Sequence, residues 1–251
     1  MKRVFITGAS SGIGAELARH YARRGAVVGL VGRRLDALQA ISASLPGNHP
    51  VYAVDVRDRA ALHRAAADFM AGGPVDIVIA SAGVSAGTLT EELEDFPVFE
   101  AIIATNLNAT VATFEPFIAP MKARGEGRLV GIASVAAIRG LPGAGAYSAS
   151  KAAVRAYCES LRVELSRTGV RVVTIAPGFI RTPMTAHNPY KMPFLMPVDR
   201  FAAKAIRSID QGVSYRVIPW QMGWVARLLA VVPDRVYDYF AVRRKRKPRL
   251  A

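Results

Sequence analysis

The stretch Thr7-Gly8-Ala9-Ser10-Ser11-Gly12-Ile13-Gly14 decides the fold of this chain. It follows the short apolar run 4–6, which is typical of a buried strand, and it precedes helical spacing of apolar residues over about 13–24. Glycines at such a turn let the backbone approach a pyrophosphate, and the helix N-terminus supplies free N–H groups with a positive dipole end. Because a strand precedes the loop and a helix follows it, the stretch predicts a dinucleotide-binding site.

Short apolar strands alternate with longer helices outward from this loop. The expected strands are 4–6, 27–31, 52–54, 75–79, 128–132, 170–175 and 215–218, and the expected helices are about 13–24, 35–44, 58–71, 96–123 and 146–168. This order predicts an α/β fold: a single-domain, doubly wound parallel sheet, Rossmann-like, with about seven strands and helices on both faces. We expect one domain over 1–240, in which the Pro- and Met-rich stretch 183–212 is a substrate lid, followed by a basic tail over 241–251.

Composition excludes several classes of protein. The 251 residues are 51% hydrophobic and 21% charged, which excludes a disordered chain. The single cysteine, Cys158, excludes a fold held by internal disulfides.

The net charge is +14, and six of the positive charges lie in 243–251, so the body is basic too and suits an anionic ligand or surface. The apolar run after Lys2 and Arg3 is too short for a secretory signal, and no stretch is apolar enough for a transmembrane helix. We therefore expect a cytoplasmic protein, with attachment to the inner face of a membrane left open.

The end of the second expected strand indicates which dinucleotide binds. Many NAD-binding folds place an acid there, which accepts from the ribose 2′-OH. This strand ends Val31-Gly32-Arg33-Arg34, and the first acid is Asp36. A guanidinium suits a 2′-phosphate because it is planar and always charged. The sequence therefore predicts NADP(H), with Arg33 as the main ligand and Arg34 as support; the alternative is that both arginines are solvated charges at a helix start.

Four polar residues form a candidate catalytic set. Tyr147 and Lys151 are four apart and share one face of a helix. A nearby ammonium favours the phenolate of a tyrosine, so this spacing suits proton transfer. Ser134 follows the fifth expected strand and has a hydroxyl that suits a reacting carbonyl, and Asn106 is a poor residue for the helix interior in which it stands.

These motifs resemble the short-chain dehydrogenase/reductase family. The loop spacing matches that family's T-G-x-x-x-G-x-G, and the Asn-Ser-Tyr-Lys set follows in its order, so the resemblance covers about 1–182. It implies hydride transfer between NADP(H) and a carbonyl or secondary alcohol. It further implies that Tyr147 is the general acid/base, that Lys151 lowers its pKa and holds the nicotinamide ribose, that Ser134 orients the substrate oxygen, and that Asn106 anchors a water linking Lys151 to solvent.

The resemblance also implies contacts with the rest of the cofactor. Asp55 and Val56 would contact the adenine, although Asp55 equally suits a helix N-cap. Ser81 stands where the family has Asn in an Asn-Ala-Gly motif. The expected cofactor-binding residues are Gly8, Ser10, Ser11, Gly12, Ile13, Gly14, Arg33, Arg34, Asp55, Val56, Ser81, Ala82, Gly83, Tyr147, Lys151, Pro177, Gly178, Ile180 and Thr182. The four histidines lack metal-ligand spacing, so no metal is expected.

Apolar residues in the last third of the chain suggest what it contacts. The lid residues are Met184, Met192, Phe194, Leu195 and Met196, which favour a hydrophobic ketone with an acyl chain or a sterol-like body. The apolar stretch 217–232, with Trp220 and Trp224, precedes the basic tail and suits an anionic membrane surface. The alternative is that this stretch packs over the substrate pocket or in a subunit interface.

Two other functions compete with the reductase interpretation. A non-catalytic NADP(H)-binding sensor or scaffold would keep the fold, and the complete Asn-Ser-Tyr-Lys set argues against it. A nucleic-acid-binding protein would use the positive charge, but the chain has no recognised reader motif, so no nucleic-acid partner is expected. The resemblance implies a homo-oligomer, a dimer or tetramer, which would form through the helix before the fifth strand and the helix carrying Tyr147.

Overall fold

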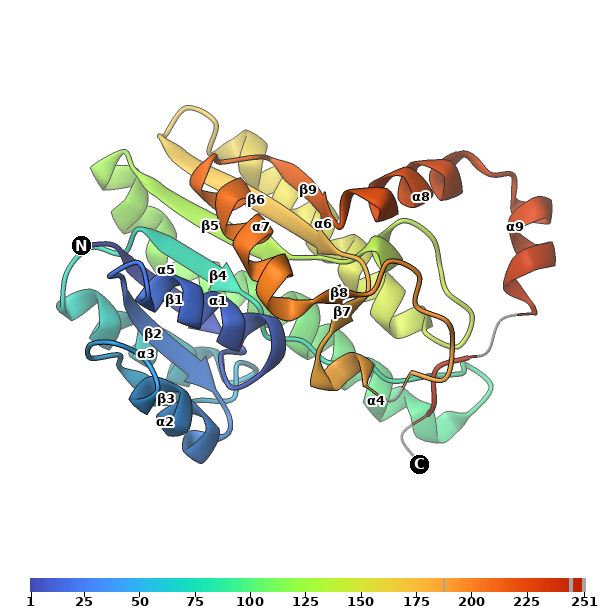
Figure 1. Ribbon diagram of the computed structural model, residues 1–251, viewed down its shortest axis with the longest axis horizontal. Helices are drawn as coiled ribbons and strands as arrows, with labels where there is room; N and C mark the ends of the chain where they lie inside the picture. Colours follow the sequence, from blue (N-terminus) through green and yellow to red (C-terminus); the bar gives the residue numbers. More distant parts are fainter. Residues whose placement is uncertain (187, 244–245, 250–251) are drawn as a thin grey trace.

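A parallel sheet forms the centre of the computed structural model, which describes residues 1–186, 188–243 and 246–249. Within these residues the sheet has seven strands in the order β3-β2-β1-β4-β5-β6-β9 (Figure 1). The strands are β1 (Arg3–Thr7), β2 (Val27–Gly32), β3 (Val51–Ala53), β4 (Ile77–Ala80), β5 (Gly127–Ile132), β6 (Val170–Pro177) and β9 (Tyr215–Ile218). The strand order reverses between β1 and β4, and ligands of such sheets bind at this switch point, outside the carboxyl ends of the strands.

Helices cover both faces of the sheet, because alternate strand residues point to opposite sides. Val4 and Ile6 of β1 belong to a core with α1 (Gly12–Ala22), α2 (Leu35–Ala43) and α7 (Val198–Asp210). Phe5 belongs to a second core with α3 (Arg59–Ala71), α5 (Ala109–Arg124) and α6 (Gly145–Glu164). The predicted doubly wound α/β fold is therefore confirmed, and the sheet strands lie where the sequence placed them to within a few residues.

The expected helix over 96–123 is interrupted. It consists of α4 (Phe96–Ile103), a π-helical turn over Ala104–Asn108, and α5. A π-turn inserts an extra residue into the helix and is frequent at functional sites. Asn106 lies in this turn, which explains why a residue of low helix propensity stands inside an otherwise helical stretch.

Part of the stretch 183–212 that we expected to be a lid belongs to the core of the domain. Of the range 183–212, residues Val198–Asp210 form α7, whose Phe201, Ala205 and Ile209 are fully buried against the sheet. The spacing of these apolar residues is helical, so the signal was present in the sequence. Two short parallel strands, β7 (Ile180–Arg181) and β8 (Met196–Pro197), were not expected. They frame the segment 182–195, of which residue 187 lies outside the described residues.

The last helices, α8 (Trp220–Val231) and α9 (Asp234–Ala241), stand out from the main body (Figure 1). The chain then returns, and the N–H of Gly87 donates to the carbonyl of Pro248 at 2.8 Å. The C-terminal segment 246–249 therefore packs on the loop that follows β4. Among the described residues, none of the helices is both long enough and apolar enough to cross a membrane.

Candidate active site

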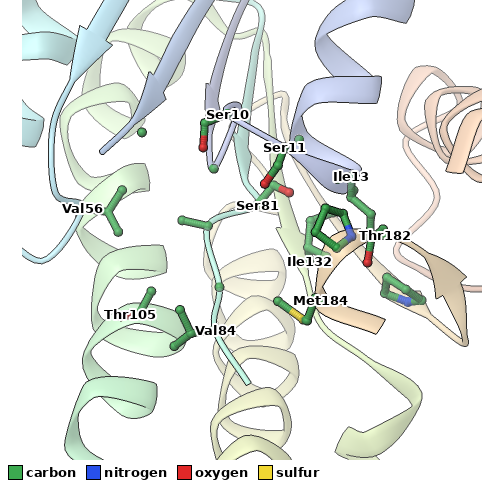
Figure 2. A pocket seen from close by; sticks show the side chains of 18 of the residues that line it. Ser10, Ser11, Ile13, Val56, Ser81, Val84, Thr105, Ile132, Thr182 and Met184 are labelled. Carbon is green, nitrogen blue, oxygen red and sulfur yellow. The ribbon is translucent and has the colours of Figure 1, made fainter. Parts of the chain in front are cut away.

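A cavity of about 590 Å³ lies at the carboxyl ends of the central strands. All the expected cofactor-binding residues line it, together with Ser134. Residues that we did not predict also line it, and these are Gly32, Val54, Val84, Thr105, Ile132, Ala133, Pro183 and Thr185. Each of these except Thr185 lies one or two positions from a predicted site residue. Their nearness to the motifs was therefore the only sequence signal that could have predicted them. Figure 2 shows Ser10, Ser11 and Ser81 in one part of this cavity and Ile13, Thr182 and Met184 in another.

The glycine loop is compressed against the loop that follows β4. Gly8 has a positive φ of 70°, and a Cβ on it would lie 2.7 Å from the backbone N of Ala82. A Cβ on Gly14 would lie 2.3 Å from the carbonyl oxygen of Gly8. Neither position accepts a side chain without moving the backbone, and this close packing brings the start of α1 to the cavity.

The N-terminus of α1 suits an anion. Its N-cap, Ser11, makes no side-chain capping hydrogen bond, and the first turn contains no acidic residue. No acidic side chain or capping side chain therefore compensates the positive dipole end and the first N–H groups of α1. The glycines bring the backbone of the loop close to this helix end. The residues present fit a dinucleotide pyrophosphate at this point.

Two arginines line the cavity after β2. Arg34 is the N-cap of α2, and its Nη2 donates to the backbone oxygen of Ser10 at 3.1 Å and to its Oγ at 3.3 Å. Arg33 is exposed and also lines the cavity. Arg34 therefore contacts the glycine loop from an exposed position, and the 2′-phosphate contacts expected of both arginines stay a prediction.

Asp55 lines the cavity but does not cap α3. The N-cap is Asp58, whose side chain accepts from the N–H of Ala61 at 2.9 Å. Arg57 instead donates to Asp55, with Nη2 2.6 Å from Oδ2. This hydrogen bond holds the pKa of the Asp55 carboxyl below its usual value. The N-cap alternative for Asp55 is therefore wrong, and its adenine contact stays a prediction.

Asn106 is completely buried and clamps two elements together. Its Oδ1 accepts from the N–H of Val84 at 2.8 Å, and its Nδ2 donates to the Val84 carbonyl at 3.0 Å and to Ser150 Oγ at 2.9 Å. The side-chain amide thus ties the loop after β4 to α6. Asn106 does not itself line the cavity. The water that we expected it to anchor stays a prediction.

Lys151 is held next to the end of β5. Its Nζ donates to the carbonyl of Ile132 at 2.8 Å and lies 6.0 Å from the ring centroid of Tyr147. Gly83 lies beside it, because a Cβ there would be 3.5 Å from Nζ and 3.2 Å from Asn106 Oδ1. Burial disfavours the charged amine and lowers the pKa of Lys151 to about 8.

Tyr147 and Ser134 face the same end of the cavity. Burial raises the pKa of the Tyr147 phenol above its usual value, and a hydrogen bond with Ser134 acts in the opposite direction. Burial outweighs that hydrogen bond, and the lowering of the Tyr147 pKa by Lys151 that the resemblance implies stays a prediction. Tyr147 therefore holds its proton at neutral pH, which is the state that a general acid needs.

Comparison with known proteins agrees with this geometry. The model of the short chain dehydrogenase family matches residues 2–192, and the chain belongs to that family. An uncharacterised oxidoreductase of Myxococcus xanthus is 40% identical over 246 residues, covering 96% of this chain and 97% of that protein. A 2-dehydro-3-deoxy-L-rhamnonate dehydrogenase (NAD(+)) of Sphingomonas sp. is 38% identical over 187 residues, covering 73% of this chain and 74% of that protein. The structure of an alcohol dehydrogenase from the archaeon Thermococcus sibiricus, complexed with 5-hydroxy-NADP, has a TM-score of 0.78 and 28% identity, covering 87% of this chain and 96% of the other.

The family assignment makes this protein an oxidoreductase that acts on CH–OH or C=O groups with a nicotinamide cofactor. The four residues expected to form the catalytic set are gathered as the family requires: Ser134, Tyr147 and Lys151 line the cavity, and Asn106 lies directly behind Gly83. The fold thus brings together residues that are up to 45 positions apart in the sequence.

The pKa of Lys151 predicts a pH dependence. An amine loses its charge as the pH rises through its pKa, so Lys151 is a cation below about pH 8 and neutral above it. We expect kcat/KM for the cofactor in carbonyl reduction, which reports groups of the cofactor-free enzyme, to fall as the pH rises through about 8. Lys151→Arg, which keeps its charge, should lose this inflection whatever its absolute rate, and Lys122→Gln, an exposed control, should retain it. A flat wild-type profile up to pH 10 would contradict the assignment.

Proposed function

We propose that this protein reduces a hydrophobic carbonyl compound with NADPH. The observation that carries the proposal is that Ser134, Tyr147 and Lys151 meet in the same cavity as the glycine loop and the arginine pair after β2. A dinucleotide lying along this cavity would have its reactive end at the three polar side chains and its adenosine end at the arginines.

When bound, the nicotinamide would supply the hydride, and the residues of this chain would handle the proton and the geometry. Ser134 Oγ would donate to the substrate carbonyl oxygen and fix its position. Tyr147 Oη would transfer its proton to that oxygen as negative charge develops there. Lys151 would bind the ribose hydroxyls, and its charge would favour the phenolate left on Tyr147. The raised pKa of Tyr147 suits reduction, because it keeps the proton on Tyr147 before the reaction.

Replacing Tyr147 tests the mechanism directly. Tyr147→Phe removes one hydroxyl and keeps the ring, so we expect NADPH to bind with unchanged affinity while turnover of carbonyl substrates falls by at least about a hundredfold. Fluorescence of bound NADPH and absorbance at its nicotinamide band would measure the two properties. Full activity in this variant would refute the role of Tyr147, and NADPH binding without turnover in the wild type would favour the sensor alternative.

The preference for NADP(H) rests on the end of β2. Arg33 and Arg34 line the cavity there, and the first acid after the strand is Asp36, in the first turn of α2. The Thermococcus sibiricus structure holds an NADP analogue, which supports the proposal, whereas the name of the Sphingomonas enzyme specifies NAD(+) and points the other way.

Arg33→Ala separates the two cofactors. A charge-assisted hydrogen bond to the 2′-phosphate is present only with NADPH, so its loss should lower the NADPH-to-NADH ratio of kcat/KM by roughly tenfold to a hundredfold. Arg23→Ala, a change of an exposed arginine just after α1, is the matched control and should leave the ratio unchanged. An unchanged ratio in Arg33→Ala would contradict the assignment.

The hydrophobic part of the substrate would lie beside Met184 and Phe194 of the segment 183–197, of which residue 187 lies outside the described residues. Met184 lines the cavity there, and it is partly exposed, as is Phe194. Apolar side chains that are not committed to the core are available to cover an acyl chain or a sterol-like body, and methionine adapts readily to irregular shapes.

We further propose that α8 lies on an anionic membrane surface. Trp220, Trp224, Leu228 and Val231 fall on one side of this helix and are 64%, 63%, 64% and 76% exposed. Arg227 stacks its guanidinium 5.2 Å from the Trp224 ring centroid, so a positive charge borders the apolar side. Aromatic side chains beside cations are typical of helices that bind anionic lipid.

Vesicles test this surface. We expect the protein to co-sediment with phosphatidylglycerol vesicles at low salt, to bind phosphatidylcholine vesicles much less, and to lose most binding in Trp220→Ala/Trp224→Ala. Phe96→Ala/Phe99→Ala removes another pair of exposed aromatic residues, which stack on α4 with centroids 6.3 Å apart, and should bind vesicles normally. If the tryptophan variant changes only the oligomeric state in light scattering, α8 packs against a second copy of the chain in the proposed homo-oligomer instead.

A further inference from the structure

The C-terminal segment 246–249 forms a strap across the loop that follows β4. The Gly87 N–H donates to the Pro248 carbonyl, and Gly87 forms an isolated parallel bridge with Arg249. Arg249 anchors the end of the strap: its Nε donates to Asp95 Oδ2 at 2.9 Å. The Asp95 carboxylate is buried and also accepts from the N–H of Leu89 at 2.8 Å, and Arg249, which is exposed, pairs with Glu92 at 3.3 Å as well.

Two glycines make the seat for the strap. A Cβ on Gly87 would lie 2.3 Å from the carbonyl oxygen of Lys247, and a Cβ on Gly143 would lie 2.9 Å from Cβ of Arg246. The loops that contain these glycines are joined by a hydrogen bond from the Thr88 N–H to the Gly143 carbonyl. The strap can therefore pack here only because residues 87 and 143, which are far from it in the sequence, are glycines.

This seat holds Lys247 against the catalytic tyrosine. Lys247 Nζ donates to Ser85 Oγ at 2.7 Å and lies 5.9 Å from the ring centroid of Tyr147. Lys151 Nζ is 6.0 Å from the same centroid, so two ammonium groups lie at similar distances from one phenol ring. Lys247 is half-buried, and none of the carboxylates in the described ranges forms an ion pair with it.

A half-buried ammonium without a counter-ion is costly unless an anion binds there. Lys151 is already committed to the Ile132 carbonyl, whereas the contacts of Lys247 within the described residues are with neutral groups, the Ser85 hydroxyl and the Tyr147 ring. We propose that Lys247 and Ser85 bind the carboxylate of the substrate, which is therefore an oxo acid whose carbonyl reacts at Tyr147. This inference rests on the proposed carbonyl reduction and deepens it: the carboxylate would lie at the strap and the apolar chain beside the segment 183–197.

Matched acids and esters test the carboxylate site. The substrates are 2-oxo-, 3-oxo- and 4-oxooctanoate, each beside its methyl ester, and the measured quantity is the acid-to-ester ratio of kcat/KM with NADPH. We expect the wild type to prefer at least one of the acids. Lys247→Gln should lower that ratio by roughly tenfold to a hundredfold, because it removes a charge-assisted hydrogen bond that only the acid makes. Lys247→Arg should restore part of the ratio, and Lys122→Gln should leave it unchanged.

The anchor of the strap gives a second variant. Arg249→Ala leaves Lys247 intact but removes the ion pair with Asp95, so it should also lower the acid-to-ester ratio. A purely structural role of the strap would lower the rates for acid and ester together and leave the ratio unchanged. An acid-to-ester ratio that is the same in the wild type and in Lys247→Gln overturns the proposal.

Binding measured without turnover separates this proposal from the proposed function. In Tyr147→Phe loaded with NADPH, calorimetry gives the Kd of each acid directly, and adding Lys247→Gln should raise it by the same roughly tenfold to hundredfold. If acids bind through Lys247 but neither acid nor ester turns over in the wild type, the carboxylate site stands and carbonyl reduction fails. If carbonyls turn over with no dependence on Lys247, carbonyl reduction stands and the carboxylate site fails.

Discussion

The side-chain amide of Asn106 is the interaction on which the site depends. It binds both backbone groups of Val84 and the hydroxyl of Ser150, so it fixes the loop after β4 against the helix that carries Tyr147 and Lys151. The glycine loop packs against the same loop from the other side, where Gly8 approaches Ala82. The strap that carries Lys247 lies a few residues further along. One buried amide therefore connects the loop after β4, on which the glycine loop and the strap both pack, to the helix that carries Tyr147 and Lys151. Because it is buried, each hydrogen bond that it makes would be expensive to lose.

Most of the fold follows from local patterns. The glycine loop, the alternation of short apolar strands with helices, and their lengths predict a doubly wound sheet, because few arrangements bury both faces of a parallel sheet. The π-turn at Ala104–Asn108 was not predictable from local spacing, and the hydrogen bonds that Asn106 makes from it to Val84 and Ser150 form only in the folded protein. The inner boundary of the lid has a different cause. The helical spacing of Phe201, Ala205 and Ile209 indicates a helix, but only the folded structure shows that α7 packs into the core.

The cofactor cavity was predicted better than the electrostatics within it. Short motifs place each residue at the end of a strand or the start of a helix, and the parallel sheet then brings those ends to one edge. The pKa shifts depend instead on how much water reaches each group, which no motif records. Burial therefore raises the pKa of Tyr147 and lowers the pKa of Lys151 to about 8. The strap was also beyond prediction from sequence, because Lys247 and Ser85 are 162 positions apart and no periodic pattern connects them.

The position of the strap has a consequence for the order in which the site is completed during synthesis. Every residue that lines the cofactor cavity lies within the first 185 positions, whereas Lys247 and Arg249 are made more than 60 residues later. The strap beside Tyr147 is therefore synthesised after all the residues that line the cavity and also after α7 and β9, which complete the core and the sheet. The strap packs where Gly87 and Gly143 have no side chains, and Arg249 pairs with the buried Asp95 carboxylate. These contacts can form only after the last residues of the chain have been made.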